Sequence, residues 1–154
     1  MIPQKELILL AHLRKNARKN LTNISRETGM PVSTIFDKIR KYEGYLIMKH
    51  TALLDFSKLG YEVKVHIVLK VPRDNRDALR EHLLKDININ SVFRINNGYD
   101  FMVEAYFRNI KEVHDFVEGL EKFKVKSPSE FYVLEEIKKE AFMADPQFVK
   151  AYGL

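Results

Sequence analysis

The chain has 154 residues, which is enough for one ordinary domain or two very small ones. Hydrophobic residues make up 45% of it and charged residues 31%, a typical globular composition. No apolar run reaches the ~18 residues that a membrane span needs, and the absence of cysteine excludes disulfides and thiolate metal sites. The first six residues lack the layout of a signal peptide, so we expect a cytoplasmic protein.

The positive charge is concentrated in the N-terminal third. Residues 1–55 contain 10 Lys and Arg against 5 Asp and Glu, whereas residues 56–154 contain 16 of each, so the first segment accounts for the whole net charge of +5. A basic module joined to a neutral one is typical of a polyanion-binding part attached to a part with another role. Charge alone leaves open the alternative of a chance asymmetry on a solvated surface.

The N-terminal segment predicts three helices and a wing. Pro3 suits the first turn of a helix, and apolar residues at helical spacing follow it. Thr22 can cap a short second helix, which Gly29 ends with a tight turn, and Pro31 then opens a third helix. Two short helices joined by a glycine turn are the outline of a helix-turn-helix. Residues 45–51 then predict a short strand pair or wing.

The second half of the chain predicts six elements in the order βαββαβ. Apolar and polar residues begin to alternate at residue 62, which is typical of a strand with one buried face. The predicted strands are 62–71, 92–95, 100–107 and 131–137, and the predicted helices are 74–85 and 110–123. The turn Asn96-Asn97-Gly98 joins two of these strands, because Asn and Gly tolerate positive φ. This order is the split βαβ, or ferredoxin-like, pattern.

We therefore expect an α+β protein with four parts along the chain. These are a winged helix-turn-helix domain over 1–50, a linker over 51–61, a ferredoxin-like domain over 62–137 and a C-terminal extension over 138–154. In the extension, Asp145 followed by Pro146 predicts a capped short helix that Gly153 would end.

The order of these parts and several short strings resemble the Lrp/AsnC family, also called feast/famine regulators. The matching strings are Ile8-Leu9, Asn16-Ala17-Arg18, Gly29 with Ser33-Thr34-Ile35, the run from Thr51 to Asp55 with Leu59-Gly60, and Tyr99-Asp100-Phe101. The resemblance covers about residues 3–137. It implies a winged helix-turn-helix before a ferredoxin-like domain that pairs into dimers, often into octamers. It also implies transcriptional regulation, frequently tuned by an amino acid.

Most candidate DNA contacts lie on the third helix, away from its apolar face. The candidates are Ser33, Thr34, Asp37, Lys38 and Lys41 on that helix, with Arg18, Lys49 and His50 outside it. On a recognition helix, the hydroxyl groups near its start would reach base edges or phosphates, and the lysines would neutralise phosphates. The carboxylate would accept from cytosine N4 or pair with a nearby cation. The alternative is a merely polar helix face.

A second candidate site is the hairpin turn formed by Asn97, Gly98, Tyr99 and Asp100, which in the family lies between dimers where the effector binds. Outward backbone N–H groups in a positive-φ turn suit a ligand carboxylate. Asp100 would accept from an α-ammonium group, and Tyr99 would cover the ligand. The alternative is a plain hairpin in which Asp100 only satisfies turn amides.

The strand over 100–107 has apolar residues on both of its faces. One face of a ferredoxin-like sheet is covered by its helices, so apolar residues on the other face predict packing against a second subunit. A two-fold dimer would also place two recognition helices on successive turns of double-stranded DNA.

Other classes of function find less support in the sequence. The five histidines lack metal-ligand spacing, and there is no glycine-rich nucleotide motif or nucleophile elbow, so we expect no metal, no cofactor and no enzyme. A minority of proteins resembling this family are sirohaem decarboxylases, in which case His66, Arg94 and Tyr106 would line a tetrapyrrole pocket. A third hypothesis is a ligand-binding assembly protein that has lost DNA binding. We favour a sequence-specific DNA-binding regulator that forms homodimers and has no membrane contact.

Overall fold

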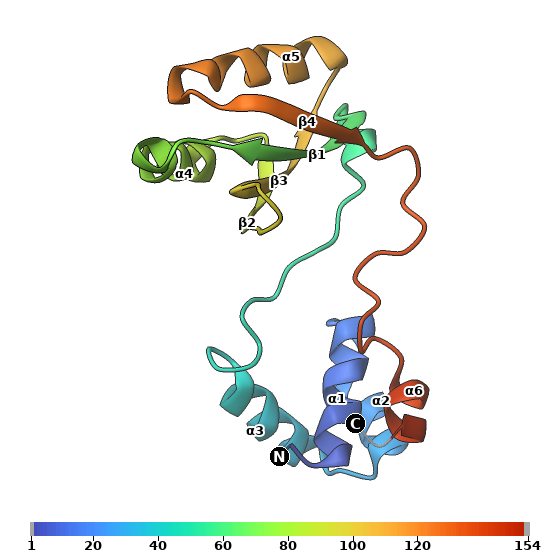
Figure 1. Cartoon of the computed structure of the whole chain (residues 1–154). Helices are drawn as coiled ribbons and strands as arrows, with labels where there is room; N and C mark the ends of the chain where they lie inside the picture. The colour runs from blue at the N-terminus through green and yellow to red at the C-terminus, as the bar shows by residue number, and fades with distance from the viewer. Residues whose placement is uncertain (1, 153–154) are drawn as a thin grey trace. The chain divides into compact units, whose positions relative to one another are not determined.

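The computed structural model describes residues 2–152 and divides the chain into two compact units. The first unit comprises Met1–Leu53 together with Ile137–Leu154, and the second comprises Leu54–Glu136. The first unit is helical, whereas the second combines helices with a sheet (Figure 1). None of the helices in the described part of the chain combines the length and hydropathy of a membrane span.

The first unit contains the predicted helix-turn-helix. Its first three helices are α1 (Gln4–Lys15), α2 (Leu21–Thr28) and α3 (Val32–Tyr42). The cap of α2 is Asn20 and not the expected Thr22, because the helix begins at Leu21 and the Asn20 side chain accepts from the Thr22 N–H at 2.8 Å. Gly29 ends α2 at a φ of 69°, the left-handed conformation that glycine adopts without steric cost.

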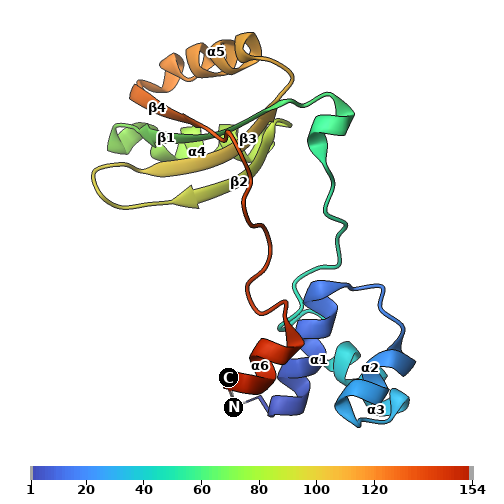
Figure 2. The same ribbon diagram turned by 90° about the vertical axis from the view of Figure 1, so that its right-hand side faces the viewer.

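The C-terminal extension completes the same unit. Its helix α6 (Pro146–Tyr152) lies beside α1 in both views (Figures 1 and 2). Val149 of α6 is only 1% exposed, and the Gln4 side chain donates to the Lys150 carbonyl at 3.1 Å. Asp145 caps the helix through the Gln147 N–H at 2.9 Å, as expected, whereas the expected stop at Gly153 lies outside the described residues.

The wing expected over residues 45–51 is reduced to a turn. The Tyr42 carbonyl accepts from the N–H groups of Tyr45, Leu46 and Ile47 at 3.2, 2.9 and 2.8 Å, and one isolated bridge joins Glu43 to Ile47. These N–H groups are therefore not available for a strand pair, and residues 48–55 have no regular structure.

The second unit confirms the predicted βαββαβ order. Its elements are β1 (Val63–Lys70), α4 (Arg76–Lys85), β2 (Ile89–Arg94), β3 (Phe101–Phe107), α5 (Ile110–Gly119) and β4 (Lys126–Tyr132). The sheet has the order β2-β3-β1-β4 with antiparallel neighbours throughout. Short 3₁₀ turns precede β1 and α4, and a third follows α5. The helix that we expected over residues 110–123 therefore ends at Gly119, and its last residues form this third turn.

One face of this sheet forms the core of the second unit, and the other face is open. The buried cluster contains every second residue of β1 and β3, from Val65 and from Phe101 onward, packed against Leu79 of α4 and Val113 of α5. The intervening residues of the same strands therefore point to the face without helices.

The last strand lies five residues earlier than expected, at Lys126–Tyr132. Its register pairs Val65 with Tyr132, and β1 begins only two residues before Val65, at Val63, so the chain beyond residue 134 has no strand to pair with. Leu134, past the end of β4, is 97% exposed despite the apolar character of its segment. Hydrogen bonding to β1 therefore determines where this strand lies, and the hydrophobicity of its own segment does not.

Candidate DNA-binding surface and effector turn

The helix α3 presents most of its predicted DNA-contacting residues to solvent. Ile35 is fully buried in the core of the first unit, which fixes the orientation of the helix. Ser33, Asp37 and Lys41 are exposed, whereas Thr34 and Lys38 are half-buried. The structure therefore brings together a polar stripe on one side of α3.

Lys38 differs from the other predicted residues because it has a buried partner. Its Nζ lies 2.9 Å from Oε1 of Glu6, a residue of α1 that is only 8% exposed. The other Glu6 oxygen accepts a hydrogen bond from the Tyr42 hydroxyl. The bond from Tyr42 and the Lys38 ammonium lower the pKa of Glu6, and the same bond raises the pKa of Tyr42 to about 12. This cluster fastens the start of α1 to α3, a role that the sequence did not suggest.

Two exposed residues of α3 were missed by the sequence analysis. The Phe36 side chain is 51% exposed, and the guanidinium carbon of Arg40 lies 6.0 Å from the centre of its ring. The spacing of these residues relative to Ser33 and Asp37 could have indicated that they share one helix face.

The remaining predicted DNA contacts lie outside α3. Arg18 and Lys49 are exposed, and His50 Nε2 lies 3.2 Å from Oε1 of Glu43. Arg18 belongs to the turn between α1 and α2, where its backbone N–H donates to the Asn16 side chain at 2.9 Å.

A second polar cluster joins His12 of α1 to Lys19 and to Glu27 of α2. His12 is only 3% exposed; its Nδ1 lies 3.1 Å from Lys19 Nζ, and its Nε2 lies 3.1 Å from Glu27 Oε2, at an angle too poor for a hydrogen bond. Lys19 also bonds to Glu27. Burial lowers the pKa of His12, and the positive charge of Lys19 lowers it further. This cluster connects the turn after α1 to α2.

The predicted effector turn has the expected backbone geometry. Asn97 and Gly98 have φ values of 60° and 83°, and Tyr99 is 36% exposed. Asp100, by contrast, is only 7% exposed: its Oδ1 lies 2.7 Å from Arg76 Nη2, and its Oδ2 accepts from the Val71 N–H at 2.9 Å. Asp100 therefore connects the turn to the end of β1 and the start of α4.

The open face of the sheet carries a network of charged side chains. Lys64 Nζ lies 3.1 Å from Glu104 Oε2 and 2.8 Å from Glu136 Oε2, and His66 Nε2 lies 3.2 Å from Glu104 Oε2. Burial alone would lower the pKa of Lys64, but its hydrogen bonds with the two carboxylates raise it above the ordinary value.

The three residues of the tetrapyrrole alternative do not come together. His66 and Tyr106 lie on the open face, whereas Arg94 pairs in register with Phe101, whose side chain is in the helix-covered core. Neighbouring strand residues in register point to the same side, so Arg94 is directed away from the other two. Among residues 2–152, no group of three or more metal-ligating side chains is placed to hold a metal ion.

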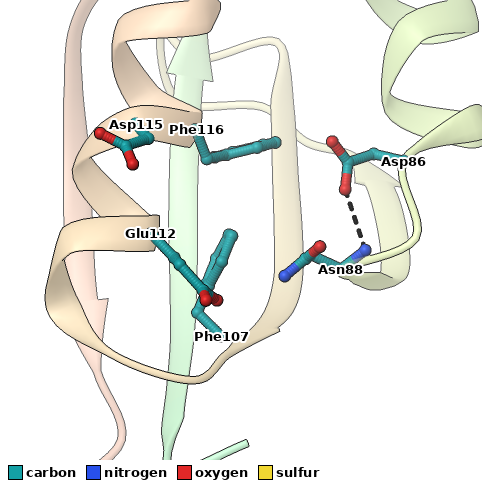
Figure 3. Close-up of a pocket in the computed structure, with 6 residues that line it drawn as sticks. All are labelled: Asp86, Asn88, Phe107, Glu112, Asp115 and Phe116. Carbon is teal, nitrogen blue, oxygen red and sulfur yellow. Dashed lines mark hydrogen bonds between the residues drawn. The ribbon is translucent and has the colours of Figure 1, made fainter.

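The second unit also contains a hollow of about 240 Å³ beside α5 (Figure 3). The lining residues are Asp86, Asn88, Phe107, Glu112, Asp115 and Phe116. Its carboxylates are already engaged: Asp86 accepts from the Asn88 N–H at 2.9 Å, and Asp115 lies 3.0 Å from Lys111. None of the predicted effector residues lines this hollow.

A helix-turn-helix with an exposed polar recognition helix, combined with a ferredoxin-like unit, defines a DNA-binding regulator of two parts. Residues 62–142 match the family of the Lrp/AsnC ligand binding domain, so the chain belongs to the Lrp/AsnC family. The HTH-type transcriptional regulator FL11 of Pyrococcus horikoshii is 32% identical over 107 residues, covering 69% of this chain and 71% of FL11.

Two further proteins are similar over most of the chain. An uncharacterised HTH-type transcriptional regulator of Pyrococcus horikoshii is 27% identical over 139 residues, covering 90% of this chain and 94% of the relative. The crystal structure of a transcriptional regulator from Neisseria meningitidis in complex with L-Met has a TM-score of 0.83 at 19% identity, covering 90% of this chain and 94% of that one. At 19% identity this structural similarity establishes the fold of the chain and nothing about its ligand.

Proposed function

We propose that this protein is a cytoplasmic transcription regulator that binds double-stranded DNA as a homodimer through α3 and responds to an amino acid. The observation that carries the proposal is the exposed stripe on α3, which is polar and cationic on a helix fixed by a buried core. Such a helix suits the major groove, where it can reach both base edges and phosphates.

The charges outside α3 support the same proposal. Arg18 and Lys49 are exposed, and together with Lys41 they give the first unit cations that suit the phosphates on either side of a groove. Lys38 contributes less, because Glu6 already neutralises it. Asp37 has no cation partner among the described residues, which fits acceptance from cytosine N4.

The effector part of the proposal rests on the turn at Asn97, Gly98 and Tyr99. These residues are exposed at the tip of a hairpin, so the N–H groups of Asn97 and Gly98 and the Tyr99 ring are accessible to a small ligand, whereas the Tyr99 N–H donates to the Asn96 carbonyl at 3.4 Å. Asp100 holds the turn in place and does not contact the ligand, because both of its carboxylate oxygens already have partners in Arg76 and the Val71 N–H. The Neisseria regulator bound to L-Met gives an example of an amino acid as ligand in this fold.

DNA shift assays over genomic fragments, including the promoter of the protein's own gene, test the proposal. We expect binding that weakens steeply with salt, because counterions are released from the phosphates. The Lys41→Ala variant should bind all sequences more weakly and lower the salt slope by about 1. Lys85→Ala, which removes an exposed lysine of α4, is the control and should bind like wild type. Absence of any shift at low salt would refute DNA binding.

A further inference from the structure

Not every polar residue of α3 lies on its solvent-exposed side. Ile35 is buried and Lys38 is held by Glu6, so both belong to the side that faces the rest of the unit. The opposite side carries Ser33, Phe36, Asp37 and Arg40, which have the i, i+3, i+4 and i+7 spacing of a single helix face. A partner that approaches this side of α3 from solvent can contact these four side chains, with exposed Lys41 beside them.

Phe36 is an unusual residue on this face. Its aromatic side chain is 51% exposed, one helical turn from Ser33 and from Arg40, and is not part of the buried core. Arg40 lies over its ring at 6.0 Å and has no carboxylate partner among the described residues. Both groups are therefore available for a partner that offers an apolar group close to a hydrogen-bond acceptor.

We propose that Phe36 and Arg40 are specificity-determining residues that read a thymine and a neighbouring guanine in the major groove. This inference rests on the proposed function. The thymine 5-methyl group is the apolar group that a phenyl ring can contact in the groove, and guanine O6 and N7 accept two hydrogen bonds from a guanidinium. The two residues are four positions apart, a rise of about 6 Å along the helix, so with about 3.4 Å per base pair the two bases lie within about two base pairs of each other.

The test begins with sites selected by the wild-type protein from random duplexes. Each thymine of the selected site is then replaced by deoxyuridine, which lacks only the 5-methyl group, and the Kd is measured by fluorescence anisotropy. At one thymine per half-site we expect this replacement to raise the Kd of wild type roughly fourfold, which corresponds to the burial of one methyl group. The Phe36→Ala variant should bind the thymine and deoxyuridine sites equally.

The matched control is Phe142→Ala, which removes a phenyl ring that is 81% exposed in the C-terminal extension. This variant should keep the wild-type preference for thymine. For Arg40, guanine is replaced by 7-deazaguanine, which lacks the N7 acceptor. Wild type should lose affinity for that site, whereas Arg40→Ala should not distinguish it from the guanine site.

The outcomes separate this inference from the proposed function. If wild type binds a selected site but does not distinguish thymine from deoxyuridine at any position, the inference is overturned and DNA binding stands. The same holds if Phe36→Ala retains the distinction, in which case Phe36 serves another partner. If wild type binds no duplex at low salt, both fail. The deoxyuridine comparison with wild type needs no variant, so it can overturn the inference even where a variant does not fold.

Discussion

The buried carboxylate of Glu6 illustrates how single residues stabilise the helical unit. A buried charge destabilises a protein unless it has partners, and Glu6 has two, Lys38 at 2.9 Å and the Tyr42 hydroxyl. These partners lie 32 and 36 residues further along the chain. The contact therefore depends on the packing of α1 against α3 and also reinforces it.

The first prediction concerns this cluster. The Glu6→Ala substitution leaves Lys38 and Tyr42 without their partner, so we expect the free energy of unfolding to fall by about 1–3 kcal/mol. Urea denaturation followed by circular dichroism measures this free energy. Glu43→Ala is the control, because the Glu43 side chain is exposed and, within residues 2–152, forms an ion pair with His50 alone. Equal effects of the two substitutions would contradict a stabilising role for the buried cluster.

The second prediction concerns pH and His12. Because its pKa is lowered in the folded protein, the unfolded chain binds a proton more readily than the folded one below about pH 6.5. The stability that neutral His12 provides is therefore present above that pH and is lost as pH falls through the folded pKa. Thermal melts of wild type and His12→Gln should differ most at pH 7.5 and converge towards pH 5. A constant difference in Tm across this range would contradict the prediction.

At the scale of elements, α6 extends the core of the DNA-binding unit. Val149 is 1% exposed against α1, so we expect Val149→Ala to lower the free energy of unfolding by roughly 1–2 kcal/mol through two lost methyl groups. Lys150→Ala, at the adjacent exposed position, should stay within about 0.5 kcal/mol of wild type. Urea denaturation compares the two variants. If they behave alike, α6 does not contribute to this core.

The hairpin between β2 and β3 carries the fourth prediction. We expect some amino acid to raise the Tm of wild type, and Tyr99→Ala to abolish that increase while leaving the Tm without ligand unchanged. Asp100→Ala should lower the Tm without ligand as well, because Arg76 and the Val71 N–H lose their partner. A melting screen over the proteinogenic amino acids tests this. If no amino acid shifts the wild-type Tm, the turn is purely structural.

For the whole molecule, the open face of the sheet predicts self-association. Phe93 and Phe131 lie on this face at 48% and 58% exposure, next to half-buried Met102 and Tyr106. A second copy would remove these apolar side chains from water. Light scattering should show a dimer for wild type and a smaller species for Phe131→Glu. Ile87→Glu, at a residue that is 95% exposed, is the control. A wild-type monomer at micromolar concentration would contradict the prediction.

The sequence by itself determined the order of the elements, the helix-turn-helix and the turns at Gly29 and Asn97-Gly98. These features depend on local rules, because periodicity and the tolerance of positive φ act over a few residues. The same local reasoning placed Ser33 and Asp37 on the exposed side of α3.

Only the tertiary structure decided which polar residues are free to bind a partner. The sequence indicates Lys38 and Asp100 as candidate binding residues. In the structure Lys38 forms an ion pair with Glu6 and Asp100 forms one with Arg76, and both partners are distant along the chain. The position of β4 and the docking of α6 were decided in the same way, by a strand edge and a helix surface formed by distant segments. Local patterns indicate which face of an element is apolar, whereas the partner of a charged group is known only after the chain has folded.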